Sequence, residues 1–332
     1  DDFIERGLLD RETPSLGFER FEQYWRSDEH ALYGYCPAPQ PLPFRALNWG
    51  ELYRGLRGRV PHGCYRAGAT VTDIRQDGAD GAVLTLADGS EHRFDLIVCA
   101  DGYRSFGRRA LFPEVSLEYA GYIGWRGVLP EYALDDITPL ARAMTGVVWH
   151  GVFGTFYFVH GSGGKQEPGE RLVNWVLYRR VAAVELPACL TDRYGVRRFG
   201  SVPPGAIRDD QLCELLEFAD RRLPAYIADI CRRSEGSFIQ AIYDVTVPSY
   251  RRGRICLAGD AGTIARPHAA SGVLRAISDE AYLADALECP ANSDTALCAW
   301  STQRVTHALR SVSYTHLRAH ETNESISYAD FF

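Results

Sequence analysis

Two stretches of the sequence place a carboxylate next to a glycine directly after an apolar, strand-like run. These are Asp101-Gly102 and Gly259-Asp260. Open α/β sheets bind ligands at the carboxyl ends of their strands, which is where such runs would deliver these residues. A carboxylate in that position can accept hydrogen bonds from a polyol. Each stretch therefore predicts a turn that contacts a ligand.

The residues after Asp101 have the features of a phosphate-binding turn. Gly102 permits a tight turn with close backbone approach, and Ser105 can cap a following helix whose free N–H groups would suit a phosphate. Arg104 and Arg108 add positive charge. The same residues also fit an ordinary strand–turn–helix in which Ser105 is only a capping residue.

The residues after Asp260 form a loop that leads into a predicted helix. Gly272 would let the positive end of that helix approach a flat ring and stabilise an anionic form of it. Pro267 would make the loop rigid, and neutral His268 could accept a substrate hydroxyl proton near pH 7. Alternatively, Asp260 caps a glycine-rich turn and His268 is a hydrogen-bonded loop residue. Arg266 could offset ligand charge or lie exposed.

Turn signals and periodicity predict the elements that position these turns. Asp77-Gly78 and Asp88-Gly89 divide residues 64–98 into a β-meander. Asn48 is the expected cap of a short helix that ends at Arg57. The other expectations are a Pro-rich connector over 36–43, strands over 147–149, 155–159, 172–178 and 237–245, a helix over 209–233 that Pro224 interrupts, and a last helix over about 294–310.

Composition excludes several classes of protein. The chain has 332 residues, is 46% hydrophobic and carries a formal charge of −7, so it can bury a core and is not built around nucleic-acid binding. No apolar run is long enough for a spanning helix, and no signal peptide is visible. The nine cysteines show neither CxxC nor zinc spacing. We therefore expect a cytoplasmic protein with reduced thiols, no metal, and no nucleic-acid or membrane partner.

The two stretches, in this order around a β-rich insert, resemble the single-component FAD-dependent aromatic hydroxylases, the class that includes p-hydroxybenzoate hydroxylase. The resemblance covers roughly residues 1–310 and is closest to the 2,6-dihydroxypyridine 3-monooxygenase branch over 172–179, 240–248 and 265–272. The matching positions are Asp95, Ala100, Asp101, Gly102, Ser105 and Arg108 in the second nucleotide motif, and Gly259, Asp260, Ala261, Pro267 and Gly272 in the flavin-ribityl motif.

This resemblance implies a mixed α/β fold, in which an FAD-binding Rossmann-like domain carries an inserted β-sheet substrate domain. It places the partial FAD-binding domain at 1–117, the substrate domain at 118–250 and the rest of the FAD-binding domain at 251–310. It implies that NAD(P)H reduces FAD, that O2 then forms a C4a-hydroperoxide, and that this species hydroxylates an aromatic or N-heteroaromatic, dihydroxypyridine-like ring. Epoxidation or flavin-dependent reduction on the same scaffold is the alternative chemistry. The class also allows a homodimer.

The resemblance assigns roles to individual residues. His268 and Pro267 are the candidate catalytic residues, and Tyr243, Asp244 and Trp175 are candidates for lining the substrate cavity. Core packing is the alternative for these aromatic side chains. The candidate cofactor-binding residues are Gly259, Asp260, Ala261, Gly272, Asp101, Gly102, Ser105 and Arg108.

The sequence also departs from the family pattern. No GxGxxG is present, and Gly161-Ser-Gly-Gly164 fits a hairpin loop instead. Leu274-Arg275 stands where the family usually has an Asn, Gly262-Thr263 replaces Ala-His, and Trp49 replaces an Arg. Because the chain starts at Asp1 without a first βαβ unit, we expect an N-terminal truncation. Such a chain would bind FAD weakly or not at all, and a non-catalytic fragment is the second alternative. Residues 311–332 resemble a translated sequencing adapter.

Overall fold

The computed structural model describes residues 2–24, 32–34, 36, 38–141, 143–149, 152–267, 272–288 and 293–321. Contacts between Cα atoms group the chain into two compact units. Unit 1 comprises residues 1–65 and 121–242, and unit 2 comprises residues 66–120 and 243–332. Residues 1–65, which the resemblance assigned to the cofactor domain, thus group by contacts with the large sheet. Each unit is described by itself below.

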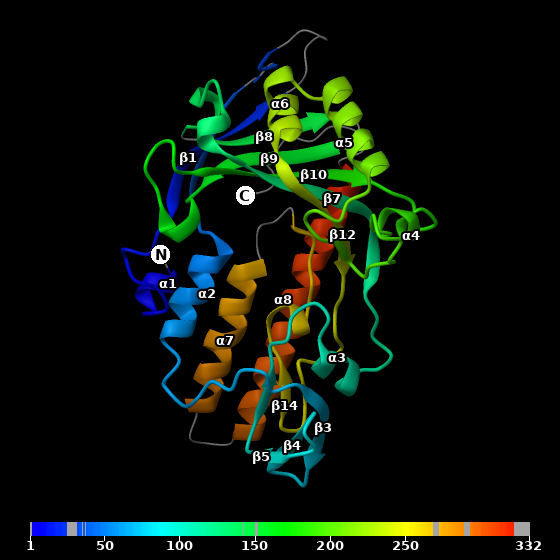
Figure 1. The fold of residues 1–332 in the computed structure, drawn as a ribbon. Helices are drawn as coiled ribbons and strands as arrows, with labels where there is room; N and C mark the ends of the chain where they lie inside the picture. Colours follow the sequence, from blue (N-terminus) through cyan, green and yellow to red (C-terminus); the bar gives the residue numbers. More distant parts are fainter. Residues whose placement is uncertain are drawn as a thin grey trace. The chain divides into compact units, whose positions relative to one another are not determined.

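Unit 1 is built on an eight-stranded sheet in the order β11-β12-β7-β10-β9-β8-β1-β2 (Figure 1). Most described pairs are antiparallel, whereas β1 and β8 are parallel. The strands are β1 Leu16–Tyr24, β2 Gln40–Ala46, β7 Glu118–Pro130, β8 Ala143–Trp149, β9 Val152–Val159, β10 Leu172–Arg180, β11 Ser201–Val202 and β12 Glu235–Asp244. The strand-forming aromatic runs predicted over 147–178 are therefore confirmed.

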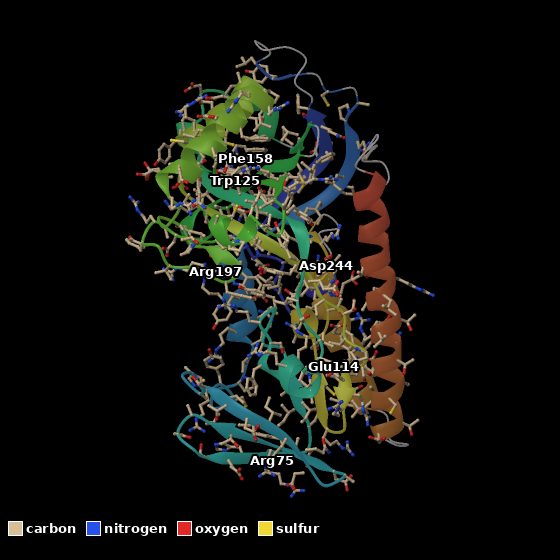
Figure 2. All side chains as sticks on the ribbon, turned by 90° about the vertical axis from the view of Figure 1, so that its right-hand side faces the viewer. Arg75, Glu114, Trp125, Phe158, Arg197 and Asp244 are labelled. Carbon is tan, nitrogen blue, oxygen red and sulfur yellow. The ribbon has the colours of Figure 1, made fainter. Side chains whose placement is uncertain are left out.

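Aromatic side chains form the core of unit 1. Trp125 and Phe158, both labelled in Figure 2, are almost fully buried in the sheet. The Trp125 ring lies 6.1 Å from that of Phe218 in helix α5 (Asp209–Arg222), so this helix packs against β7. Trp175 is fully buried, stacks on Phe156 at 6.0 Å and donates its indole N–H to Ser234 at 2.8 Å. Its surroundings are those of a core residue.

The two predicted helix boundaries of unit 1 are confirmed. Asn48 caps helix α2 (Trp49–Gly58), accepting a hydrogen bond from the Gly50 N–H at 2.8 Å. Buried His160 in turn accepts from the Asn48 N–H at 3.0 Å. Helix α5 ends before Pro224, because proline cannot continue the helical hydrogen bonds, and α6 begins at Ala225. Helix α6 spans Ala225–Arg233, α1 spans Asp2–Glu5, and the short 3-10 turns are Glu131–Ala133, Thr138–Leu140 and Ser162–Gly164.

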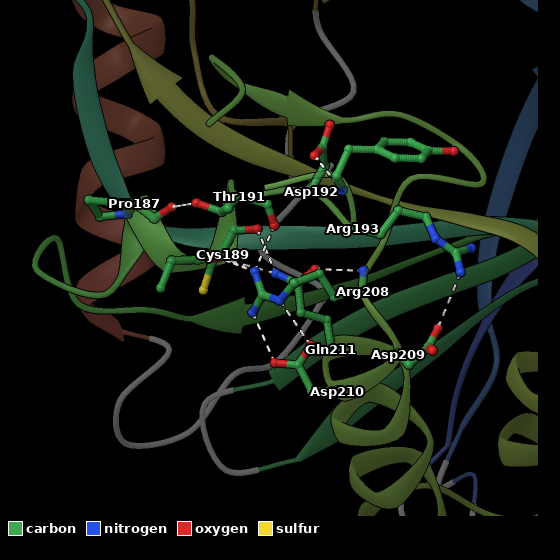
Figure 3. A network of polar contacts seen from close by, with 11 residues as sticks. Pro187, Cys189, Thr191, Asp192, Arg193, Arg208, Asp209, Asp210 and Gln211 are labelled. Atoms are coloured by element: carbon green, nitrogen blue, oxygen red, sulfur yellow. Dashed lines mark hydrogen bonds and ion pairs between the residues drawn. The ribbon is translucent and has the colours of Figure 1, made fainter. Parts of the chain in front are cut away.

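The segment before α5 is held by Arg208 (Figure 3). Its guanidinium donates to the carbonyl oxygens of Ala188 at 2.8 Å and Thr191 at 2.7 Å, and to Asp210 at 2.9 Å. Gln211 adds a bond to the Cys189 carbonyl at 2.9 Å. These bonds connect α4 (Leu186–Cys189) to the start of α5. The bonded donors of Arg208 and Gln211 thus stabilise the protein's own fold.

Unit 2 contains two three-stranded sheets. The first is an antiparallel meander of β3 (Val71–Asp77), β4 (Gly81–Leu86) and β5 (Glu91–Phe94), which confirms the meander predicted over 64–98 except for its last strand. That strand, β6 (Ile97–Cys99), pairs in the second sheet, because its buried side chains pack with elements distant in sequence. The second sheet has the order β13-β14-β6, in which β6 runs parallel to β14 (Ile255–Leu257). The remaining elements are β13 Arg251–Arg252, α3 Phe106–Leu111, the 3-10 turn Gly259–Ala261, α7 Gly272–Glu288 and α8 Ser293–Glu321.

Helix α8 is longer than the sequence predicted. It continues through Glu321 and so includes the first part of the adapter-like segment, while residues 322–332 lie outside the described residues. Trp300 on α8 and Tyr250 meet edge to face at 6.0 Å within the buried core of unit 2. Among the described helices, none is long and apolar enough to cross a membrane. The mixed α/β fold class is confirmed.

Candidate functional site

The two predicted turns leave the same edge of the sheet β13-β14-β6, whose strands β14 and β6 are parallel. Strands β6 and β14 are neighbours in which Leu257 pairs with Cys99. The Ala258 N–H donates to the Cys99 carbonyl at 3.0 Å, directly before both turns begin. Because parallel strands present their carboxyl ends at one edge, Asp101 and Asp260 belong to adjacent turns. The structure therefore brings together the two stretches that the sequence singled out.

The first turn is stabilised by Asp101 itself. Its carboxylate accepts hydrogen bonds from the Ser105 hydroxyl at 2.5 Å and from the backbone N–H groups of Phe106 at 2.5 Å and Gly107 at 3.2 Å. Ser105 caps α3 by accepting from the Arg108 N–H at 2.8 Å. The N–H groups expected to be free for a phosphate are thus already bonded within the turn. Ser105 is therefore the cap of α3, and its contact with a cofactor stays a prediction.

Arg108 connects the first turn to the second. The residue is 2% exposed, and its guanidinium donates to the carbonyl oxygens of Asp260 at 2.9 Å, Ala261 at 3.0 Å and Tyr103. Burial lowers the pKa of Arg108, an effect that the nearby Asp101 and Asp260 carboxylates oppose. Its donors serve the protein backbone, so Arg108 positions both turns.

Gly107 lets helix α3 lie directly against strand β6. A Cβ atom at this position would lie 2.4 Å from both the Cβ and the Sγ of Cys99, a distance that real side chains do not reach. Gly107→Ala is therefore expected to lower the free energy of unfolding by about 1–3 kcal/mol in urea denaturation, although helix propensity alone favours alanine.

The matched control for that prediction is Gly58→Ala. Gly58 ends α2, and no atom lies within 4 Å of the position that its Cβ would take. This substitution should stabilise by about 0.5–1 kcal/mol, because only propensity changes. Equal effects at the two glycines would contradict close packing at Gly107.

The second turn is held by a buried acidic residue that the sequence analysis missed. Gly259 has a φ of +59° and donates its N–H to Asp279 at 2.8 Å. Asp279 is fully buried and pairs with Arg304 on α8 at 2.5 Å. Burial raises the pKa of Asp279, and the Arg304 charge and the Gly259 N–H reduce this rise. The spacing of Asp279 from Ala276 and Leu283 places the three residues on one face of α7. This spacing was the signal in the sequence that could have indicated Asp279.

Asp260 and Arg275 meet at the second turn, and of the two only Asp260 is exposed. The Asp260 side chain is 49% exposed, whereas that of Arg275 is 4% exposed, and the two are joined by a bond of 3.1 Å from Nη2 to Oδ1. Within the described part of the chain, Nε and Nη1 of Arg275 have no hydrogen-bond partner. A carboxylate acceptor thus lies beside unused donors, an arrangement that fits a hydroxyl-bearing ligand.

The other predicted site residues lie around this edge or apart from it. Ala261 is buried, Gly272 begins α7, and Pro267 is exposed next to residues 268–271. His268 lies outside the described residues. Gly102 has a φ of +74°, which accounts for glycine at that turn. Trp175 belongs to the core of unit 1.

Asp244 lines a polar cavity within unit 2. Its carboxylate accepts from the Arg266 guanidinium at 3.0 Å, and both side chains are largely buried. Arg266 therefore offsets charge on the protein itself. The Tyr243 ring packs at 6.0 Å from that of Tyr119. The cavity has a volume of about 230 Å³ and is lined by Glu114 and Asp244 (both labelled in Figure 2), Val115, Ser116, Glu118, Val245, Thr246 and Val312.

The chain is similar to known FAD-dependent proteins. An "FAD binding domain-like" family model matches residues 119–244, and an "FAD binding domain" model matches residues 233–315. The chain is 25% identical to 2,6-dihydroxypyridine 3-monooxygenase from Paenarthrobacter nicotinovorans, over 83% of this chain and 68% of that protein. It is 30% identical to aurachin C monooxygenase/isomerase from Stigmatella aurantiaca, over 80% and 61% respectively. The chain thus spans roughly two thirds of these relatives' length.

A solved structure shows the same fold. The structure of 2,6-dihydroxypyridine-3-hydroxylase from Arthrobacter nicotinovorans superposes with a TM-score of 0.87 at 23% sequence identity. The match covers 98% of this chain and 81% of that one. The fold of this chain is therefore one that a known protein also adopts.

Proposed function

Because the chain belongs to the single-component FAD-dependent aromatic hydroxylases, we propose that its protein hydroxylates an electron-rich aromatic ring with NAD(P)H and O2. The observation that carries this proposal is the pair of adjacent turns in unit 2. Their exposed edge carries the half-exposed Asp260 carboxylate, which accepts from Nη2 of Arg275, while Nε and Nη1 of Arg275 have no partner among the described residues. Such an edge suits the ribityl chain of a flavin, whose hydroxyls both donate and accept.

The residues of unit 2 fit FAD, which when bound supplies the oxygen-activating chemistry of this class. Asp260 would accept from the cofactor, and Gly259 would hold the turn in its left-handed conformation. Gly272 would place the start of α7, with its positive dipole end, near the ring. We also propose Asp101, Gly102, Ser105, Arg108 and Ala261 as cofactor-binding residues. The bonds of Asp101, Ser105 and Arg108 within the turns would hold these groups in position.

For the substrate, we propose an N-heteroaromatic ring of the dihydroxypyridine kind. The similarity to a 2,6-dihydroxypyridine monooxygenase supports this choice. His268 would accept the proton of a substrate hydroxyl, and Pro267 would hold the loop that carries it. Asp244 and Tyr243 in unit 2, and Trp175 in the sheet of unit 1, remain proposed substrate residues. Unit 2 would be the cofactor domain, and the sheet of unit 1 the substrate domain.

Product analysis tests the proposed reaction. The purified chain is incubated with saturating FAD, NADH or NADPH, O2 and 2,6-dihydroxypyridine, and the products are identified by mass spectrometry. The proposal expects a ring-hydroxylated product whose new oxygen comes from O2. An epoxide, a reduced ring, or pyridine nucleotide oxidation that yields only peroxide would contradict it. A homodimer located in the cytoplasm also stays a proposal, and size-exclusion chromatography with light scattering tests its stoichiometry.

A further inference from the structure

Arg275 is a buried cation whose donors are not all used. It lies in the first turn of α7, with a side chain that is 4% exposed. Nη2 donates to Asp260, but Nε and Nη1 have no partner among the residues that the structure describes. Leaving donors of a charged group unmet in a protein interior costs free energy. A fold retains such a group at a functional site when a ligand completes its hydrogen bonds.

The nearby protein groups do not supply the missing acceptors. Asp279, the buried carboxylate closest to this turn, is bonded to Arg304 and to the Gly259 N–H. Arg108, a third buried guanidinium, uses its donors on backbone carbonyls. Buried positive charge therefore exceeds buried negative charge around the second turn. Among the described residues, Nε and Nη1 of Arg275 thus lack an acceptor, which an oxygen of a bound ligand would supply.

The neighbouring Asp260 restricts which kind of ligand group can bind beside Arg275. Its half-exposed carboxylate accepts hydrogen bonds and would repel a phosphate placed against it. A hydroxyl, by contrast, can donate to Asp260 and accept from Arg275 at the same time. The adjacent pair thus matches a polyol more closely than a pyrophosphate.

We propose that Arg275 is a flavin-binding residue, whose free guanidinium edge donates to the ribityl chain while Asp260 accepts from it. This assignment rests on the proposed function. It gives a role to the position at which Leu274-Arg275 departs from the usual pattern of the family.

If Arg275 binds flavin, replacing it should lower flavin affinity without lowering the stability of the flavin-free protein. In Arg275→Met, the affinity of the full chain for FAD and for riboflavin, measured by flavin fluorescence titration, should fall by about tenfold in both cases. Without added flavin, the unfolding temperature should equal or slightly exceed that of the wild type, because the unmet donors are gone. Arg275→Gln keeps one amide donor and should lose less affinity.

Arg171→Met is the matched control in unit 1. Arg171 is a largely buried guanidinium that is fully engaged with buried Glu131, including a bond of 2.8 Å from Nε. Its replacement should lower the unfolding temperature and leave flavin affinity unchanged. The same pattern in Arg275→Met would overturn the assignment, as would a loss of FAD affinity with none for riboflavin. Absence of saturable flavin binding by the wild-type chain would contradict the proposed function itself, and the assignment with it.

Discussion

Replacing Asp279 with alanine is expected to lower the free energy of unfolding by about 3–5 kcal/mol and to remove saturable FAD binding. Asp279 is the buried partner of Arg304, and its other oxygen fixes the Gly259 N–H. The substitution leaves a buried guanidinium without its carboxylate, which is the costly way to break a buried pair. It also releases the turn that carries Asp260. Urea denaturation and flavin fluorescence titration measure the two effects.

Two further variants separate these effects. Asp285→Ala removes an exposed carboxylate from the same helix and should change stability by less than about 0.5 kcal/mol. The double variant Asp279→Leu with Arg304→Met replaces the ion pair with apolar side chains, which often restores stability. It should not restore FAD binding, because the Gly259 N–H still lacks its acceptor. Recovery of full flavin affinity in the double variant would show that Asp279 does not position the turn.

Arg108→Ala is expected to lower the free energy of unfolding by about 2–4 kcal/mol, because three backbone carbonyls lose a charged donor. The same change should weaken FAD binding, since Arg108 joins the turn of Asp101 to that of Asp260. Chemical denaturation gives the first quantity, and titration with FAD gives the second. Lysine at this position keeps the charge but cannot reach three carbonyls with a planar fork, so Arg108→Lys should lie between alanine and wild type.

The neighbouring Arg109 provides the comparison for Arg108. Arg109 is exposed, and its described hydrogen bond is to the carbonyl of Arg104 within the same turn. Arg109→Ala should therefore have a small effect on stability and none on FAD affinity. If Arg108→Ala were as mild as Arg109→Ala, the two turns would not depend on the guanidinium that connects them.

The sequence was sufficient to predict where the two turns lie, because an apolar run followed by Gly-Asp or Asp-Gly has a direct structural meaning. It identified strands β6 and β14, the meander of β3 to β5, and the Asn48 cap. These features depend on short-range rules of strand alternation, turn chemistry and capping. The adjacency of Asp101 and Asp260 then follows from the parallel pairing of two strands.

The burial of charged residues could not be predicted in the same way. Arg275, Asp279 and Arg304 are charged types that are usually exposed, and only tertiary packing places them inside unit 2. For the same reason, the sequence suggested free N–H groups after Asp101, whereas the aspartate itself occupies them. Three expectations stay predictions: the role of His268, the weak or absent FAD binding, and the interpretation of both chain ends.

Asp260→Asn shows whether the second turn binds the flavin through Asp260 and Arg275. Asparagine can still accept the bond from Arg275 but removes the opposite charge of a half-exposed pair, so the free energy of unfolding should fall by at most about 1 kcal/mol. It places an amide in place of one carboxylate oxygen, however, and should weaken FAD binding by about tenfold or more in a fluorescence titration. Of the two outcomes expected from the missing βαβ unit, weak binding or none, we predict weak but saturable binding of FAD by the wild-type chain, together with this loss. Equal FAD affinities for the two proteins would contradict this prediction.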